Sequence, residues 1–254
     1  MLLTIDIGNT NIAIGIFQGN DLLYHWRLST NKLKTSYEYG IDIYNLFFYS
    51  NILKENIKGI IISSVVPSLQ DEFEKMCKNF FNINPVIVGP GIKTGISIKI
   101  ENPKELGADR VVNAVAAFYK YKTSCIIVDF GTATTFDYVS EKGEYQGGLI
   151  APGLFISLSA LAEKTSKLPF VDIHKPSKIV ATNTVEAIQS GIYYGYIGLV
   201  KEIIKRIKEE KSITSIVIAT GGISNLISKE IKEIDKIEPY LTLEGLKILY
   251  EKNI

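Results

Sequence analysis

Apolar residues alternate with polar or small residues near the start of the chain, over positions 3–7 and again over positions 12–16. A period of two is typical of β-strands, so this pattern predicts two strands joined by a turn at residues 8–11. Further along, strands and helices are expected to alternate, which predicts an α/β protein. The further strands are expected at residues 22–28, 59–66, 85–88, 145–150 and 215–219. Helices are expected at residues 36–56, 109–121, 154–165 and 184–209. Two more helices are expected, one after Pro67 and one that begins near Leu243.

The opening pattern occurs a second time about half a chain length later. Residues 125–139 again contain an apolar strand, an Asp-x-Gly turn and a second strand, with Asp129 in the place of Asp6. Such a repeat favours two similar halves. We expect them at residues 1–115 and 116–254, with the C-terminal half forming a dimer contact.

Composition narrows the class of protein. The chain has 254 residues, of which 46% are hydrophobic and 22% charged, which suits two packed domains and excludes intrinsic disorder. A formal charge of +1 lacks the basic excess of nucleic-acid-binding proteins, so no nucleic acid partner is expected. Cys77 and Cys125 form neither a disulfide framework nor a zinc site and are expected to be buried. Without a secretory signal or a membrane-length apolar run, the protein is predicted to be cytoplasmic and to have no membrane partner.

The turn that begins at Asp6 suits a phosphate group with its metal ion. A carboxylate ends the strand, Gly8 lets backbone N–H groups approach a ligand, and small hydroxyl and amide side chains follow. No P-loop lysine follows it. An ordinary hairpin turn is the alternative. The second copy at Asp129 favours the phosphate interpretation, because two facing turns would place donors on both sides of a polyphosphate.

Asp109 and Arg110 precede an apolar helical run and allow two interpretations. Asp109 is either a helix N-cap or a catalytic base. Arg110 places a cation in a first helical turn, where it opposes the helix dipole, and the chain contains few arginines. An acid beside an arginine at a helix start is typical of a base next to an anion-binding group.

The long helix expected from Thr184 carries glycines on one face, at positions 191, 195 and 198. Each glycine costs about 1 kcal/mol relative to alanine inside a helix, so this face is expected to pack closely on a partner. Either the core or a second subunit is possible, and the frequency of two-fold dimers favours the subunit. Asn183 and Glu186 predict a capping box at its start.

The chain resembles the type III pantothenate kinases over nearly all of its length. Each motif that carries the resemblance is short, but their order along the chain is specific. The motifs are Asp6-x-Gly-Asn-Thr-Asn, Gly107-Ala-Asp-Arg110, Asp129-x-Gly-Thr132, Gly147-Gly-x-Ile-x-Pro-Gly153, Leu168-Pro169, the segment from Thr184 to Gly191, and Thr220-Gly-Gly222.

This resemblance implies the fold of the acetate and sugar kinase/Hsp70/actin superfamily. Two ribonuclease-H-like halves, consistent with the repeat, would hold the active site in the cleft between them. The implied activity is ATP-dependent phosphorylation of pantothenate, the first step of coenzyme A biosynthesis. The implied enzyme is a homodimer that needs a monovalent cation, potassium or ammonium, with magnesium accompanying ATP.

The resemblance also implies roles for individual residues. Asp109 matches the family's proton acceptor, and Asp129 matches the ligand of the monovalent cation. Thr132 matches a second ATP contact, and Thr184 matches a pantothenate contact. The first ATP-binding hairpin would comprise Asp6, Ile7, Gly8, Asn9, Thr10, Asn11, Ile12 and Ala13. The pantothenate-binding stretch would comprise Gly107, Ala108, Asp109 and Arg110.

One position departs from the family pattern. Ile100 stands where family members often have a tyrosine, so the substrate site would stay apolar but lose an aromatic contact. Two alternatives to the pantothenate kinase remain at this point. One is another small-molecule kinase of the superfamily, and the other is a non-catalytic regulator of the accessory-factor type. The presence of Asp6, Asp109 and Asp129 disfavours the regulator.

Overall fold

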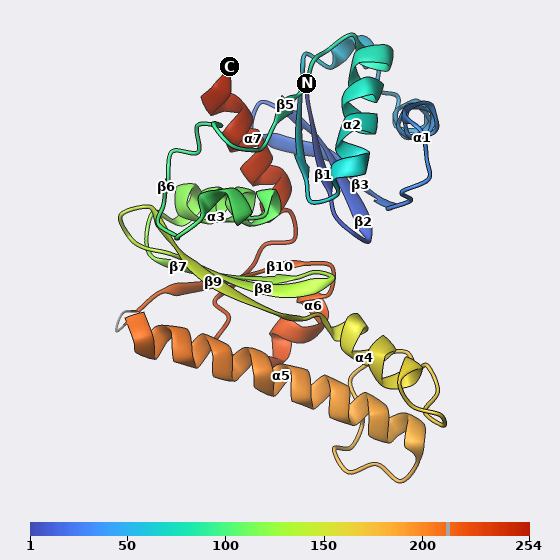
Figure 1. Ribbon diagram of the computed structural model, residues 1–254, viewed down its shortest axis with the longest axis vertical. Coiled ribbons are helices and arrows are strands. Elements are labelled where there is room, and N and C mark those ends of the chain that lie inside the picture. The colour runs from blue at the N-terminus through green and yellow to red at the C-terminus, as the bar shows by residue number, and fades with distance from the viewer. Residues whose placement is uncertain (212–213) are drawn as a thin grey trace. The chain divides into compact units, whose positions relative to one another are not determined.

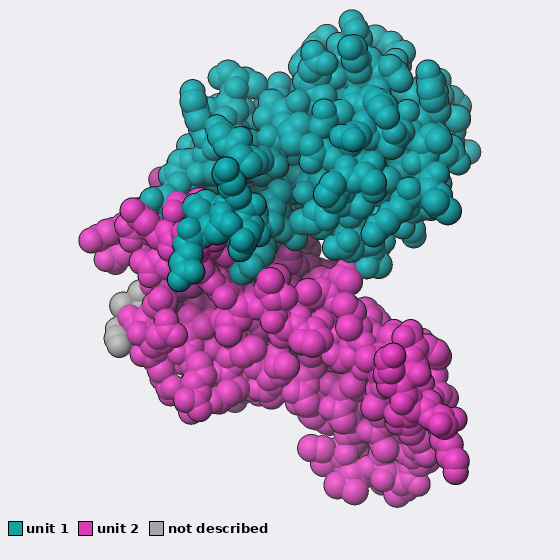
Figure 2. All heavy atoms as spheres, in the orientation of Figure 1, with its two compact units in different colours: residues 1–97, 101–120, 241–254 teal, residues 98–100, 121–240 magenta. Residues whose placement is uncertain are grey.

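The computed structural model describes residues 1–211 and 214–254 and divides them into two compact units. Figure 2 colours them separately: unit 1 comprises residues 1–97, 101–120 and 241–254, and unit 2 comprises residues 98–100 and 121–240. The chain therefore returns to unit 1 at its C-terminal end. The division into compact units does not test where each repeat of the sequence begins and ends. The two halves expected at residues 1–115 and 116–254 therefore stay a prediction.

Unit 1 contains a five-stranded sheet in the order β3-β2-β1-β4-β5 (Figure 1). β1 pairs antiparallel with β2 and parallel with β4, so the first strand of the chain lies at the centre of the sheet. The strands expected in this part of the chain are confirmed. Their bounds are β1 (Leu2–Ile7), β2 (Asn11–Gln18), β3 (Asp21–Ser29), β4 (Gly59–Ser64) and β5 (Val86–Ile87).

Helices cover both faces of this sheet because both faces are apolar. One core joins the strands to α1 (Ser36–Tyr49) and α2 (Pro67–Met76). A second core joins the opposite face to α3 (Ala108–Tyr121) and α7 (Leu241–Asn253). The shorter helical segments of unit 1 are the 3-10 turns Lys54–Asn56 and Pro103–Glu105 and the π-helical turn Cys77–Phe81.

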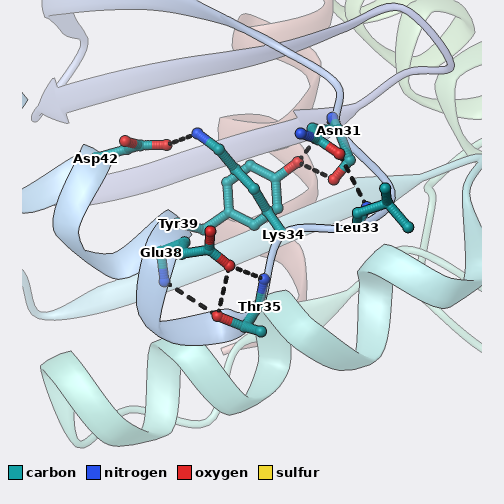
Figure 3. Close-up of polar contacts among 7 residues, drawn as sticks. All are labelled: Asn31, Leu33, Lys34, Thr35, Glu38, Tyr39 and Asp42. Carbon is teal, nitrogen blue, oxygen red and sulfur yellow. Dashed lines mark hydrogen bonds and ion pairs between the residues drawn. The ribbon is translucent and has the colours of Figure 1, made fainter.

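Helix α1 is shorter than the sequence pattern predicts. It begins with a capping box, in which the Thr35 hydroxyl accepts from the Glu38 amide and the Glu38 carboxylate accepts from the Thr35 amide (Figure 3). It ends at Tyr49, because Asn51 adopts a left-handed conformation with φ of 53°. The prediction that this helix extends to Asn56 is therefore wrong. Asparagine tolerates that conformation better than most residues, so it ends helices readily.

Unit 2 repeats the topology of unit 1. Its six-stranded sheet has the order β11-β10-β7-β8-β9-β6, and β7 again pairs antiparallel with the next strand and parallel with β10. The predicted internal repeat is thus confirmed at the level of the fold. The strands are β6 (Ser97–Ile98), β7 (Cys125–Phe130), β8 (Ala133–Val139), β9 (Glu144–Pro152), β10 (Ile216–Gly221) and β11 (Lys236–Ile237).

A long helix, α5 (Thr184–Lys211), covers one face of the second sheet. Its buried side chains, among them Tyr193, Val200 and Ile204, pack against Ile126 and Val128 of the central strand. Unit 2 also contains α4 (Leu154–Glu163), α6 (Ser224–Ile227) and the 3-10 turn Ser228–Glu230.

Two smaller expectations are also met. Both cysteines are buried and free of disulfide bonds. Among residues 1–211 and 214–254, the helices are too short or too polar to cross a membrane.

Candidate active site

The turn between β1 and β2 is held rigidly by backbone and side-chain hydrogen bonds. The Gly8 amide donates to the Asn11 carbonyl at 3.0 Å, and a Cβ on Gly8 would lie 2.9 Å from that oxygen. Behind the turn, the Thr30 hydroxyl donates to the Gly8 carbonyl at 2.7 Å and the Thr30 amide donates to the Thr10 carbonyl at 2.9 Å. Half-buried Asp6 is thereby placed beside a fixed turn whose tip is exposed.

The equivalent turn of unit 2 is one residue shorter. The last register pair of the first hairpin is Ile7 with Ile12, whereas that of the second is Phe130 with Thr134. Asp6 and Asp129 nevertheless hold the same place, one residue before the end of the first strand. The repeat therefore conserves the position of the acid within each unit but not the shape of the turn after it.

A different contact supports the second turn. Thr132 is exposed at its tip, and a Cβ on Gly153 would clash with the Thr132 carbonyl oxygen. Only glycine allows this close approach, and Gly153 is also the residue from which α4 starts. Gly153 thus brings the start of α4 against the turn that contains Thr132, whereas residues 147–152 of the same motif belong to β9 rather than to a turn.

Asp129 lies at a point where backbone and side-chain oxygen atoms meet. In register it faces Thr135 on β8 and Thr220 on β10. A Cβ on Gly221, whose φ is +93°, would lie 2.5 Å from Asp129 Oδ1 and 2.6 Å from the Phe130 carbonyl oxygen. Only glycine allows the backbone at position 221 to approach the Asp129 carboxylate and the Phe130 carbonyl this closely, and oxygen atoms of these two kinds are the ligands that hard cations prefer.

A buried tyrosine lies near this acid. Tyr196 projects from α5 and forms a short hydrogen bond with the Thr134 hydroxyl. Burial raises the pKa of Tyr196, the negative charge of Asp129 raises it further, and the hydrogen bond with Thr134 lowers it. The phenol consequently stays neutral and contributes a hydroxyl dipole rather than a second charge close to Asp129.

Asp109 lies inside its helix rather than before it. Helix α3 starts at Ala108, and the first helical hydrogen bond runs from the Val111 amide to the Gly107 carbonyl at 3.2 Å. Asp109 Oδ1 accepts from the Arg110 amide at 2.8 Å. The carboxylate thus binds an amide that lacks a helical partner, but Asp109 is not the residue before the helix that the N-cap interpretation requires.

The remaining predicted site residues belong to unit 2. Half-buried Ile100 packs near Gly147, since a Cβ there would lie 3.8 Å from Ile100 Cγ2. Thr184 is the exposed first residue of α5, and the Asn183 side chain accepts from the Glu186 amide at 2.9 Å, so the predicted N-cap is confirmed. Thr184 borders an open groove of about 330 Å³ whose other lining residues are Leu161, Leu168, Ala187, Ile188, Gly191 and Ile192.

Two polar groups near these residues were not predicted from the sequence. Asp137 on β8 is fully buried, and its carboxylate accepts from the Tyr145 hydroxyl at 2.6 Å and from the Thr135 hydroxyl at 3.1 Å. Ser63 at the end of β4 is also fully buried. The pairing of neighbouring strands could have located both residues. Ser63 on β4 pairs with Asp6 on β1, and Asp137 lies on β8, the strand that pairs with the strand of Asp129.

Two α/β units with the same strand topology, each with an acid before a tight turn at the end of its first strand, define a protein with two ribonuclease-H-like halves. Solved structures share this fold. A Baf-family protein of Campylobacter jejuni, assigned as a transcriptional activator, superposes with a TM-score of 0.61 at 20% identity, covering 99% of this chain and 98% of its own. A Sinorhizobium meliloti protein assigned as a 2-dehydro-3-deoxygalactonokinase gives 0.60 at 11% identity, covering 99% and 96%. At these identities the likeness establishes the fold alone.

Sequence relatives define the family. Residues 2–206 match the family described as type III pantothenate kinase. The type III pantothenate kinase of Geobacter sulfurreducens is 58% identical over 253 residues, covering 100% of this chain and 99% of its own, and that of Pelobacter propionicus is 55% identical with full coverage of both. The chain belongs to the type III pantothenate kinase family. The reaction of this family is the ATP-dependent phosphorylation of pantothenate in coenzyme A biosynthesis.

Proposed function

We propose that Asp109 is the proton acceptor with which this chain transfers the γ-phosphoryl group of ATP to the primary hydroxyl of pantothenate. The observation that carries the proposed activity is the 55–58% identity to named type III pantothenate kinases along the whole chain. For Asp109 itself, the support is its half-buried carboxylate, fixed at the start of α3 by the hydrogen bond from the Arg110 amide. A base held in one orientation is what proton transfer requires.

ATP is proposed to bind along the two turns. Residues 6–13 would hold one side of the phosphates through backbone N–H groups, and Thr132 would contact them from the second turn. Magnesium fits such a site, because it is usually held by one or two carboxylates together with substrate phosphates rather than by a complete protein cage. Asp6 is the carboxylate available at the first turn.

Asp129 is proposed to hold the monovalent cation, potassium or ammonium. The support for this role is that Asp129 Oδ1 and the Phe130 carbonyl oxygen both lie against the backbone of Gly221. Both donors are oxygen atoms, which hard cations prefer. When bound, the cation would supply positive charge, with Asp129 as its carboxylate ligand and the neutral Tyr196 adding no competing charge.

Pantothenate is proposed to bind at residues 107–110, with Ile100 and Thr184 as further contacts. Arg110 supplies the positive charge that the carboxylate of pantothenate needs. During transfer, the pantothenate hydroxyl oxygen forms a bond to the γ-phosphorus while the bond from that phosphorus to the β,γ-bridging oxygen breaks. Asp109 takes the hydroxyl proton, and ADP leaves. The protein mainly positions the two substrates and balances charge.

A homodimer built on the glycine face of α5 is part of the same proposal. Gly191, Gly195 and Gly198 are exposed, and a Cβ added to any of them would meet nothing within 4 Å in the described chain. The chain's own described core therefore does not pack on this face. A second subunit remains as the partner that would explain three glycines inside a helix. We also propose a cytoplasmic location, where ATP is supplied.

The test of the proposed function is an ADP-release assay with alternative acceptors and cations. Pantothenate should support turnover, and it should do so best with potassium or ammonium present. Acetate and sugars should not support it. Turnover with a sugar but not with pantothenate would favour another kinase of the superfamily, and no turnover with any acceptor would favour a non-catalytic regulator.

A further inference from the structure

Ser63 carries a buried hydroxyl group for which the structure provides no partner. The residue is 0% exposed, and its Oγ makes no hydrogen bond to residues 1–211 or 214–254. Leaving such a group unsatisfied costs about 1–3 kcal/mol. The hydroxyl of the next residue, by contrast, has hydrogen-bond partners. Ser64 Oγ donates to the Val66 carbonyl and accepts from the Val66 amide, both at 3.1 Å. Alanine at position 63 would fold without this cost, so a ligand is the simplest reason for a serine.

The position of Ser63 points toward the phosphate-binding turn. Parallel pairing places Ser63 directly opposite Asp6, and residues paired in register project from the same face of a sheet. This is the face that α3 and α7 cover, because Ile61, two residues before Ser63, packs in their core. Ser63 and Asp6 therefore lie side by side at the ends of β4 and β1.

The chain segment after Ser63 leads to the proposed base. The Val65 amide donates to the Ile7 carbonyl at 3.0 Å, which ties this segment to the end of β1. A Cβ on Gly107 would lie 3.8 Å from Val65 Cγ1 and 2.6 Å from Asp109 Oδ1. Within one compact unit, Ser63 thus lies beside Asp6, and the segment that follows it reaches Gly107, two residues before Asp109.

We propose that Ser63 binds the terminal phosphate of ATP by donating its hydroxyl proton to a γ-phosphate oxygen. The proposal rests on the proposed function and adds a binding residue to it. The phosphoryl group in transfer must lie between the phosphate-binding turn and the base, and Ser63 lies beside Asp6 at the start of that turn. Asp6 by itself repels a phosphate, so a phosphate beside it needs uncharged donors as well as a cation. A serine hydroxyl meets this need without adding charge, and phosphate oxygens are strong acceptors.

Ser63→Ala separates a ligand-binding role from a structural one. Without ligand, the variant should unfold at the same temperature as the wild type or a higher one, because an unpaired buried hydroxyl is removed. Isothermal titration calorimetry with a non-hydrolysable ATP analogue and magnesium should show about a tenfold weaker affinity, which corresponds to the loss of about 1.4 kcal/mol. The affinity for ADP, which lacks the terminal phosphate, and the KM for pantothenate should not change.

The chain provides a matched control in Ser228, whose Oγ is also buried and unpartnered but belongs to a 3-10 turn of unit 2. Ser228→Ala should leave the affinity for the ATP analogue unchanged. Ser63→Cys replaces the hydroxyl with a thiol, which is similar in size but a weaker donor. Its affinity for the ATP analogue should fall by a smaller factor than that of Ser63→Ala. This variant tests the ligand-binding role if Ser63→Ala does not fold.

Three results would overturn the proposal for Ser63. They are unchanged affinity of the Ser63→Ala variant for the ATP analogue, an equal loss of affinity for ADP, and a lower unfolding temperature with normal binding. Failure of the wild type to bind the analogue or to phosphorylate pantothenate would instead refute the proposed function, so the two failures are distinguishable.

Discussion

Replacing Asp109 with asparagine removes the proposed base while keeping the local hydrogen bond. Asparagine Oδ1 can still accept from the Arg110 amide, the bond that Asp109 Oδ1 makes at 2.8 Å. What is lost in the folded state is one negative charge in the first turn of α3, worth about 0.3–1 kcal/mol through the helix dipole. For a protein of this size, that shifts the unfolding temperature by roughly 2–4 °C at most.

The expected effect on catalysis is much larger than the effect on stability. An amide does not accept the pantothenate proton, so kcat should fall by about 10²- to 10⁴-fold, or about 3–5 kcal/mol of transition-state stabilisation. The affinity for ATP should be unchanged, because the proposed phosphate turns are intact. The acidic limb of the pH profile of kcat/KM should also disappear, since that limb reports the protonation of the base in the free enzyme.

Steady-state kinetics by coupled ADP release, together with calorimetric ATP titration and thermal unfolding, measure these quantities. The matched control is Glu105→Gln, which removes an exposed carboxylate that accepts from the Asn102 side chain just before α3. Its kcat should stay close to that of the wild type. A folded Asp109→Asn variant with near wild-type kcat would limit Asp109 to stabilising the helix start, and the proton acceptor would have to be another residue.

Three further outcomes follow from the structure. Asp129→Ala should abolish the activation of the enzyme by potassium, and equal wild-type rates in sodium and potassium buffers would contradict the cation role. Gly195→Leu, whose Cβ would meet nothing within 4 Å in the described chain, should yield a folded monomer by light scattering while Gly195→Ala remains dimeric; a dimeric leucine variant would exclude this face as the contact. Burial raises the pKa of Cys77 and of Cys125 to about 12, so a thiol reagent at pH 8 should react with them only after unfolding, and prompt reaction of the native protein would refute their burial. Because the unfolded thiols ionise near pH 8.5, stability should decrease as the pH rises above that value.

Local patterns predicted most of the elements, because each depends on residues close in sequence. The period of two located the strands around Asp6, the repeat of that opening located those around Asp129, and Asn183 marked the start of α5. The end of α1 was misplaced, since it depends on a single left-handed residue, Asn51. β6 and β11, which are two residues long, were not predicted, whereas the equally short β5 was.

Long-range packing could not be predicted in the same way. The return of α7 to unit 1 depends on a close approach between helices far apart in sequence, where a Cβ on Gly245 would clash with the Val112 carbonyl. The burial of Ser63 depends on that packing too, because α3 and α7 cover its face of the sheet. From sequence, Ser63 and Ser64 are equivalent residues after an apolar strand; only the folded chain gives one of them a local partner and leaves the other without one.

The two hairpins share a repeated pattern, and we propose a different role for each. Both units place an acid at the same point of the sheet, but the surroundings differ. The longer first turn is fixed by Thr30, which leaves its exposed tip available to a large anion. Beside Asp129, the backbone of Gly221 lies against the carboxylate and the Phe130 carbonyl, so oxygen atoms gather there. A phosphate needs donors and a cation needs acceptors, so the same acid is expected to serve ATP and its metal in unit 1 and a monovalent cation in unit 2. The difference in turn length and support, rather than in the acid itself, sets the two proposed roles apart.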